Sequence, residues 1–493
     1  QHHHTASHIQ RAAPAIGMRR TAHEILHETN NAAARYPIHA HETRETAYEG
    51  STVRSFWAEL AWLPSGLARG GVRMTVSDGR FVTVETRTPA QPDDLKLCGV
   101  VMPGLANAHS HAFQRSLRGR THSGIGHGHA WFARMYAAAD RMDPDRYFTL
   151  ARATFAEMAI AGYTLVGEFH YLHHGPDGRP YDDPNAMGAA LIAAAAEAGI
   201  RLTLLDACYL AGGLTSNGHI DLNPVQRRFS DGSVDAWLER MTRIPQTELM
   251  RRGAAIHSIK TVPREAAAHM AQAIGEQPLH VYVSEQHSEN LACQMFYGMT
   301  PTELLADIGA LGPEVTAVHA AHLSDNDIAL LGDHESQVVV CPSSERDMGE
   351  SLGRIRTMLD AGIPIGVGSD QQARIDPFSE LRELELNERV TTGERGRLTA
   401  AELVACGTVN GYQSLGWYDG GVIAPGRLAD FVVINSNTPR TVGAKAAELL
   451  YAATAADIDT VVVGGRVIVT GGQHHLGPVA PMLRSALLGL RGH

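Results

Sequence analysis

The sequence predicts an α/β fold, a (β/α)8 TIM barrel with a small flanking β-sandwich domain built from both chain ends. Short apolar runs that look like buried parallel strands alternate with longer helical patterns, which is typical of repeated βα units. Eight such runs occur, and eight strands close a TIM barrel. Polar residues follow nearly every run, whereas an open sheet concentrates its site at one switch point, so a doubly wound sheet is the second alternative.

The expected strands are short and apolar, and occupy residues 101–109, 163–169, 200–208, 254–260, 279–284, 315–320, 336–341 and 363–368. Between them, helical patterns cover residues 146–161, 184–198, 264–275, 300–311 and 377–391. Because parallel strands of a TIM barrel all end on one face, we expect the polar residues that follow them to form one site.

A second, smaller domain is expected from the segments outside the barrel. Both segments carry alternating patterns and turn signals, such as Ser77-Asp-Gly79 and Val461-Val-Val-Gly-Gly-Arg-Val-Ile-Val469. The N-terminal extension is either an added helix or an unstructured arm. The expected organisation is a tag or linker over 1–17, an extension over 18–50, the small β domain over 51–99 and 413–480, the barrel over 100–412 and a C-terminal tail over 481–493.

The amino-acid composition argues against several classes of function. The chain is 44% hydrophobic and 19% charged, which is typical of a globular enzyme. A net charge of −11 without a long basic block argues against nucleic acid and acidic membranes as partners. Five cysteines without a CxxC pair suit reduced thiols in a cytoplasm. The Ala-rich stretch 187–214 is interrupted by charges and fails as a membrane span, and no signal peptide is visible.

A His-X-His unit, His109-Ser-His111, directly follows the apolar run Val100 to Leu105. In a strand, residues i and i+2 point to the same face, so both imidazoles would aim at one point, as a metal requires. The chain has 27 histidines, so this spacing alone is a weak signal. The polar residues at the later strand ends strengthen the interpretation of this unit as a metal site.

Four later strand ends carry residues suited to hydrolysis: His257, Glu285, His319 and Asp370. A metal-activated water needs a base that takes its proton and passes it to a leaving nitrogen, and Glu285 and Asp370 are the candidates. Each residue also has an ordinary structural explanation: Glu285 as a solvated helix start, His319 as a core histidine, and Asp370 as a helix N-cap. Their joint placement favours the catalytic interpretation.

The chain resembles the amidohydrolase superfamily and, within it, the N-formimidoyl-L-glutamate deiminases of histidine degradation. The resemblance extends over nearly the whole chain from about residue 51. Its most specific part is Glu168 to His174 followed by Gly175 to Tyr181. The matching motifs are Pro103 to Arg115, Gly167 to His174, Gln226 to Ser230, Val318 to His322, Cys341 to Arg346 and Gly368 to Asp370.

This resemblance implies a (β/α)8 barrel with one divalent metal, zinc, that hydrolyses a formimidoyl C=N bond and releases ammonia. It implies a homodimer and a small-molecule substrate. Position by position, it implies metal ligands at His109, His111 and Asp370, an acid/base at Glu285, a substrate-polarising or water-steering His319, proton-transfer assistance by Asp370, and substrate contacts by Gln114, Tyr171 and His257.

Three positions depart from the family pattern. Tyr282 stands where the family has its third zinc histidine, and a phenol with an ordinary pKa near ~10 is a poorer zinc ligand than imidazole. Phe132, after Trp131, stands where the family has an Arg that holds substrate carboxylate. Lys260 replaces a second carboxylate-binding Arg, so the charge is kept but the bidentate fork is lost.

Three hypotheses stay open at this point. The first is a metal-dependent deiminase of a formimidoyl-type substrate, with Tyr282 or water as a further ligand. The second is a related enzyme acting on a different small molecule, for example in a specialised biosynthetic pathway. The third is a metal-poor, non-catalytic relative that kept the barrel for binding. Tyr282 is the feature that discriminates among them.

Overall fold

The structure is a computed structural model that describes residues 53–122 and 129–490. The expected tag or linker (1–17) and N-terminal extension (18–50) lie outside the described residues. Within the described part of the chain, no helix is long and apolar enough to cross a membrane.

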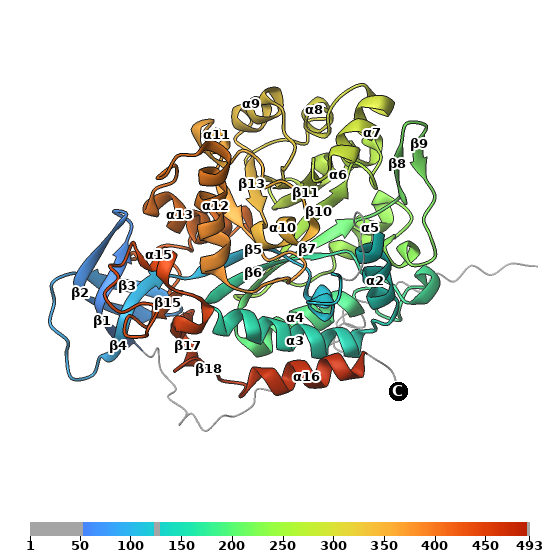
Figure 1. Cartoon of the computed structure of the whole chain (residues 1–493). Helices are drawn as coiled ribbons and strands as arrows, with labels where there is room; N and C mark the ends of the chain where they lie inside the picture. Colours follow the sequence, from blue (N-terminus) through green and yellow to red (C-terminus); the bar gives the residue numbers. More distant parts are fainter. Residues whose placement is uncertain (1–52, 123–128, 491–493) are drawn as a thin grey trace, which may run out of the picture. The chain divides into compact units, whose positions relative to one another are not determined.

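Eight parallel strands form the barrel (Figure 1). Neighbouring strands pair in the order β14-β13-β12-β11-β10-β7-β6-β5, and a parallel bridge between Ser110 and Asp370 connects the two ends of this sheet. The predicted fold class is therefore confirmed. The barrel strands are β5 (Leu105–Ser110), β6 (Tyr163–His170), β7 (Arg201–Cys208), β10 (Met250–Ser258), β11 (Leu279–Val283), β12 (Val315–His319), β13 (Gln337–Val340) and β14 (Ile365–Val367).

The first predicted strand, 101–109, is two strands in different sheets. β4 (Leu95–Pro103) belongs to the flanking sheet, and β5 begins two residues later in the barrel. Gly104 separates them at a point of close approach, because a Cβ there would lie 2.3 Å from Thr164 Oγ1. A continuous apolar pattern cannot reveal this change of sheet, since both strands are buried.

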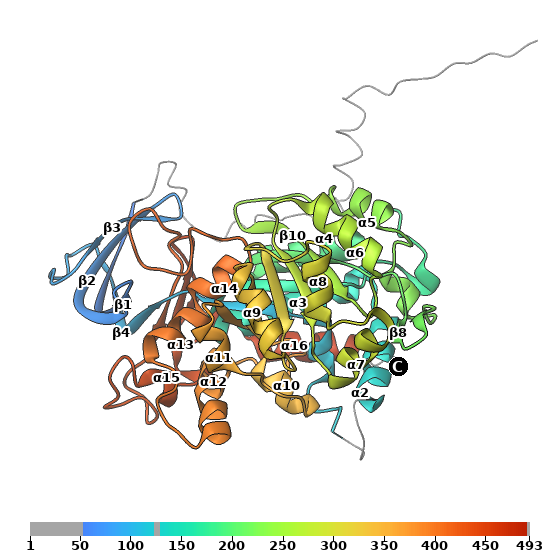
Figure 2. The ribbon, with the colours of Figure 1, turned by 90° about the horizontal axis from the view of Figure 1, so that it is seen from above.

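Helices surround the barrel strands (Figure 2). Local sequence fixes their ends: Asp143 caps α3 before Pro144, and Thr300 and Glu303 form a capping box at α8. The predicted helix 300–311 is shorter than expected because Gly309 adopts a positive φ of 70°. The helices are α2 (His129–Asp140), α3 (Pro144–Ile160), α4 (Ala186–Ala198), α5 (Val234–Met241), α6 (Arg264–Ile274), α7 (His287–Tyr297), α8 (Pro301–Asp307), α9 (Asp325–Asp333), α10 (Pro342–Met348), α11 (Ile355–Asp360), α12 (Pro377–Thr392), α13 (Ala400–Gly407), α14 (Val409–Ser414), α15 (Leu449–Ala452) and α16 (Val479–Gly489).

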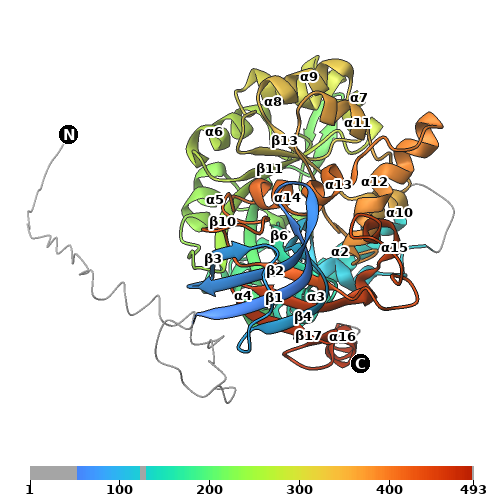
Figure 3. The same ribbon diagram turned by 90° about the vertical axis from the view of Figure 1, so that its left-hand side faces the viewer.

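A second sheet is built from strands near both ends of the described chain (Figure 3). β4 joins the two groups, because it runs parallel to β1 and antiparallel to β15. Phe431 packs against Phe56 and Phe81 in its core, with ring centroids 5.1 and 6.1 Å away. The strand order is β18-β17-β16-β15-β4-β1-β2-β3, with β1 (Arg54–Leu63), β2 (Leu67–Ser77), β3 (Arg80–Glu85), β15 (Phe431–Ile434), β16 (Ile458–Val463), β17 (Arg466–Thr470) and β18 (Gln473–His474).

A buried ion pair connects the barrel to the flanking sheet. Arg201 at the start of β7 donates to both carboxylate oxygens of Asp430, over 2.6 and 3.0 Å. Tyr412 and the backbone of Gly464 donate to the same carboxylate. Since both charged side chains are nearly inaccessible, each depends on the other for compensation of its charge.

Replacing Arg201 by Met is expected to lower the free energy of unfolding by about 3–5 kcal/mol, because it leaves Asp430 buried without its cation. Chemical denaturation followed by circular dichroism measures this change. Arg243→Met is the control, because Arg243 and Glu239 form an exposed pair whose loss should cost less than about 1 kcal/mol. Equal losses in the two variants would contradict the structural role of the Arg201 pair.

Candidate active site

His109 and His111 lie at the end of the first barrel strand, and their imidazoles converge. Both side chains are buried. His111 Nδ1 lies 2.9 Å from the carbonyl oxygen of Phe169, so it donates a proton there and leaves Nε2 as the inward-facing lone pair. Burial lowers the pKa of His109 to about 3, which keeps this imidazole neutral. Two convergent imidazoles are suitable ligands for a divalent metal.

Asp370 lies just beyond β14, next to the two histidines. Its Oδ1 lies 3.5 Å from His109 Nε2 and 3.3 Å from His111 Nε2. Its backbone N–H donates to the His109 carbonyl, and the His111 N–H donates to the Asp370 carbonyl, which fixes the chain where the barrel closes. Burial alone would raise the pKa of Asp370, but its close contacts with the imidazoles of His109 and His111 hold it well below its usual range.

Tyr282 points from β11 into the space between these groups. Its Oη lies 2.6 Å from His111 Nε2 and 3.1 Å from His109 Nε2. Its ring stacks on Phe169 with a centroid distance of 4.7 Å and an interplanar angle of 8°. Burial raises the pKa of Tyr282 well above its usual value, so the hydroxyl is a neutral hydrogen-bonding group here.

The distances among these donor atoms test whether a metal fits. A tetrahedral site with bonds of about 2.0–2.1 Å has donor–donor separations of about 3.3 Å. The separations of Asp370 Oδ1 from the two imidazole nitrogens, 3.3 and 3.5 Å, match this value. The Tyr282 hydroxyl lies somewhat closer to His111 than that geometry requires. The separations of Asp370 from the two imidazoles therefore fit one divalent metal on His109, His111 and Asp370. The Tyr282 hydroxyl is at hydrogen-bond distance from His111 and would have to move away from it to become a fourth ligand.

His319 lies beside this centre, and Glu285 is close enough to His319 to help raise its pKa. His319 Nδ1 is 3.2 Å from Glu345 Oε1, and donor atoms of His319, His109 and Asp370 all lie within 4.8 Å of one another. Burial alone would lower the pKa of His319, but the hydrogen bond to Glu345 and nearby carboxylates raise it to about 9. His319 has a φ of 71°, a strained backbone conformation of the kind that clusters at functional sites.

The predicted substrate residues Gln114, Tyr171 and His257 also come together. Gln114 Nε2 donates to Tyr171 Oη over 2.9 Å, and the rings of Tyr171 and His257 lie 5.5 Å apart. His257 also contacts the ring of Tyr282 at 5.1 Å. Burial lowers the pKa of His257 well below its usual value, so it is a neutral donor or acceptor. The contacts place all three within reach of the histidine pair.

The two remaining predicted substrate residues, Phe132 and Lys260, differ from each other in their surroundings. Phe132 on α2 is 37% exposed and contacts the ring of Trp131 at 5.2 Å. Trp131 in turn donates to Gln371, the residue after Asp370. Lys260, after β10, directs its Nζ toward the carboxylate of Glu285, 3.6 Å away.

Three residues near this site were not predicted from the sequence: Glu289, Asp347 and Gln371. Glu289 accepts a hydrogen bond from the backbone of Glu285, and Gln371 donates to Asp347 over 3.1 Å. Both carboxylates lie on helices that follow barrel strands, α7 and α10. The Glu285 to Glu289 spacing of one helical turn is the signal that could have indicated the first of them.

A second histidine cluster, formed by His170, His173 and Asp206, is better explained by structure. Its ligand atoms also lie within 4.8 Å of one another, and its side chains are buried. The Asp206 carboxylate, however, accepts two hydrogen bonds of 2.8 Å from Arg240. The guanidinium of Arg240 already compensates the negative charge of Asp206. We therefore interpret the cluster as a buried ion-pair network.

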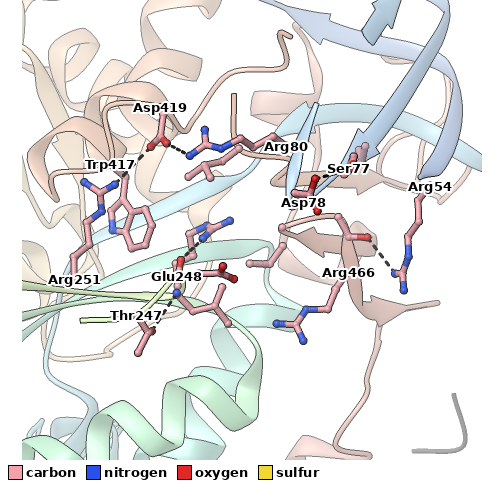
Figure 4. Close-up of a pocket in the computed structure, with 18 residues that line it drawn as sticks. Arg54, Ser77, Asp78, Arg80, Thr247, Glu248, Arg251, Trp417, Asp419 and Arg466 are labelled. Atoms are coloured by element: carbon pink, nitrogen blue, oxygen red, sulfur yellow. Dashed lines mark hydrogen bonds and ion pairs between the residues drawn. The ribbon is translucent and has the colours of Figure 1, made fainter. Parts of the chain in front are cut away.

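The described residues also line a cleft of about 720 Å³ at the opposite, N-terminal end of the barrel strands (Figure 4). Two of its cations already have partners: Arg80 pairs with Asp419 at 2.6 Å, and Arg251 lies over the Trp417 ring at 4.3 Å. The N-terminal face of a TIM barrel usually serves stability, so this cleft is separate from the candidate active site.

Comparison with known proteins places the chain among enzymes. Residues 100–468 match the model of the Amidohydrolase family. The formimidoylglutamate deiminase of Pseudomonas aeruginosa is 34% identical over 85% of this chain and 95% of its own length. The 5′-deoxyadenosine deaminase of Methanothermobacter thermautotrophicus is 26% identical over 83% of this chain and 92% of its own length.

Solved structures give the same result for the fold. An amidohydrolase from Brucella melitensis superposes with a TM-score of 0.81 and 29% identity, covering 89% of this chain and 100% of that protein. An adenosine deaminase from Xanthomonas campestris with bound zinc has a TM-score of 0.74 and 20% identity, covering 89% and 98%.

Proposed function

Because the chain belongs to the amidohydrolase family and acts on C–N bonds other than peptide bonds, we propose that it hydrolyses a formimidoyl or amidine-type group and releases ammonia. The observation that supports this proposal most is the convergence of His109, His111 and Asp370 at the ends of the first and last barrel strands. Zinc is the first candidate for the metal, because two imidazoles and a carboxylate are ligands that it prefers.

The metal would be held by His109, His111 and Asp370, with Tyr282 as fourth ligand. When bound, it would supply Lewis-acid chemistry and lower the pKa of water. The Asp370 carboxylate, which is ionised, could also act as a proton acceptor, and backbone hydrogen bonds to His109 and from His111 hold this residue in place.

Glu285 is proposed as the group that carries the proton to the leaving nitrogen. Its side chain is partly open to solvent, and it forms an ion pair with Lys260, whose Nζ lies 3.6 Å away. His319 as a cation, held by Glu345, can donate a hydrogen bond to the reacting group. Gln114, Tyr171 and His257 would orient the substrate, because they contact one another and the ring of Tyr171 lies 5.2 Å from that of His111.

Ammonia release tests the proposal. Protein purified without chelator and loaded with zinc should release ammonia from N-formimidoyl-L-glutamate or from another compound in a panel of formamidines, and a coupled glutamate dehydrogenase assay detects it. Release that depends on both protein and metal supports the proposal. If neither zinc nor another divalent metal gives ammonia from any formamidine in the panel, the proposed reaction is wrong.

A second candidate, a related enzyme acting on a different small molecule, is favoured by Phe132 and Lys260. Neither side chain offers the bidentate fork that binds a carboxylate strongly. In this case cyclic amides and amidines without carboxylates would be hydrolysed faster than the glutamate derivative. A third candidate, binding without turnover, predicts that ligands bind the zinc-treated protein but release no ammonia.

A further inference from the structure

We propose that the substrate of this chain carries an uncharged or cationic tail rather than carboxylates, and that Glu289 and Asp347 set this preference. The inference rests on the proposed function, because it concerns the same site. Two separate groups of contacts support it, one around Lys260 and one around Trp131.

The charge of Lys260 is compensated before any substrate arrives. Its Nζ lies 3.6 Å from Glu285 Oε2 and 3.8 Å from Glu289 Oε2. Glu289 is almost fully buried, and the backbone N–H of Glu285 donates to it over 3.0 Å, so this carboxylate is held in place. Its other oxygen has no hydrogen-bond partner, which leaves acceptor capacity for a donor from a ligand. A substrate carboxylate here would have to compete with two fixed carboxylates for one ammonium group.

A third carboxylate lies on the side of the site where Trp131 approaches. Asp347 on α10 accepts from Gln371 over 3.1 Å, and Gln371 accepts from the indole N–H of Trp131. His122 Nε2 is 2.6 Å from the other Asp347 oxygen, but this histidine is 58% exposed. Phe132, the neighbour of Trp131, adds an apolar surface that is 37% exposed. An apolar surface that is connected to an acid through Trp131 and Gln371 suits an alkyl chain that ends in a neutral or positive group.

The number of charged groups also favours a substrate without carboxylates. Among the described side chains in these two groups of contacts, away from the candidate metal ligands, the carboxylates are Glu285, Glu289 and Asp347. The groups that offset them are the ammonium of Lys260 and the exposed imidazole of His122, so the carboxylates outnumber the one permanent cation. Like charges at short range disfavour a ligand strongly in a partly desolvated site. A dicarboxylate tail is therefore a poor match to this surface.

Three formamidines of similar length test the inference: N-formimidoyl-L-glutamate, N-formimidoyl-butylamine and N-formimidoyl-1,4-diaminobutane. We expect kcat/KM for ammonia release from the uncharged or cationic compound to exceed that for the glutamate derivative by at least about tenfold. A preference for the glutamate derivative overturns the inference but leaves the proposed reaction standing.

Binding separates this inference from the reaction itself. The corresponding guanidines, which resist hydrolysis, are titrated into the zinc-loaded protein by calorimetry. If no formamidine is hydrolysed, the proposed reaction fails, yet tighter binding of butylguanidine or agmatine than of N-amidino-glutamate still supports the charge preference. Equal or tighter binding of N-amidino-glutamate overturns it.

Variants identify the responsible residues. Asp347→Asn should shift the ratio of affinities toward the dicarboxylate by about tenfold, and Phe132→Arg should shift it further, because each change makes this side of the site more positive. Phe132→Leu is the matched control and should leave the ratio unchanged. Ratios that stay constant in both Asp347→Asn and Phe132→Arg, with unchanged melting temperatures, contradict the assignment.

Discussion

Replacing Glu285 by Gln is expected to lower kcat by about 10²–10⁴-fold, because an amide of the same shape cannot take up and pass on a proton. KM should change much less, since Gln keeps most of the packing. Metal content should be unchanged, because Glu285 is not among the donors that converge with His109 and His111. Steady-state ammonia release and elemental mass spectrometry on the same zinc-loaded sample measure both properties.

The control for this variant is Glu265→Gln, which changes an exposed carboxylate in the first turn of α6. It should keep the activity of the unchanged protein. If Glu285→Gln retained more than about a tenth of kcat, proton transfer would have to run through another group. Asp370, whose carboxylate lies beside both histidines, would then be the first alternative to test.

Much of the fold follows from the hydrophobic pattern. Runs such as 279–284 and 315–320 coincide closely with β11 and β12, because buried parallel strands read as continuous apolar segments bounded by polar residues. The pattern does not specify which strands pair. It therefore merged β4 and β5 into one run, although Gly104 divides them between two sheets.

The site residues that could be predicted from the sequence are those at the ends of the barrel strands. His109, His319 and Asp370 meet because parallel strands of a barrel all deliver their last residues to the same face. Glu289 and Asp347 were not predicted, because their places depend on how the helices after two strands pack around the site. The roles of Gln114, Tyr171 and His257, the domain boundaries and the homodimer stay predictions.

The second large prediction concerns Tyr282. We expect its hydroxyl to act as the fourth metal ligand. Tyr282→His should raise zinc affinity by at least about tenfold, because a neutral imidazole binds zinc better than a phenol that must first lose its proton. Tyr282→Phe should lower zinc affinity by a similar factor, since it removes only the oxygen that lies 2.6 Å from His111 and 3.1 Å from His109. Competition with a chromogenic chelator measures both affinities, and elemental mass spectrometry checks the stoichiometry.

Tyr282→Phe distinguishes two roles for the hydroxyl, because it preserves the ring that stacks on Phe169. If the oxygen is a ligand, its loss weakens zinc binding. If the oxygen instead occupies the space that the metal needs, its loss strengthens binding, and that result would contradict the prediction. Tyr297→Phe is the control, because its hydroxyl bonds His219 at 2.9 Å, away from the candidate ligands. An effect confined to Tyr282 would therefore come from the metal centre itself and not from the loss of a hydrogen-bonded phenol in general.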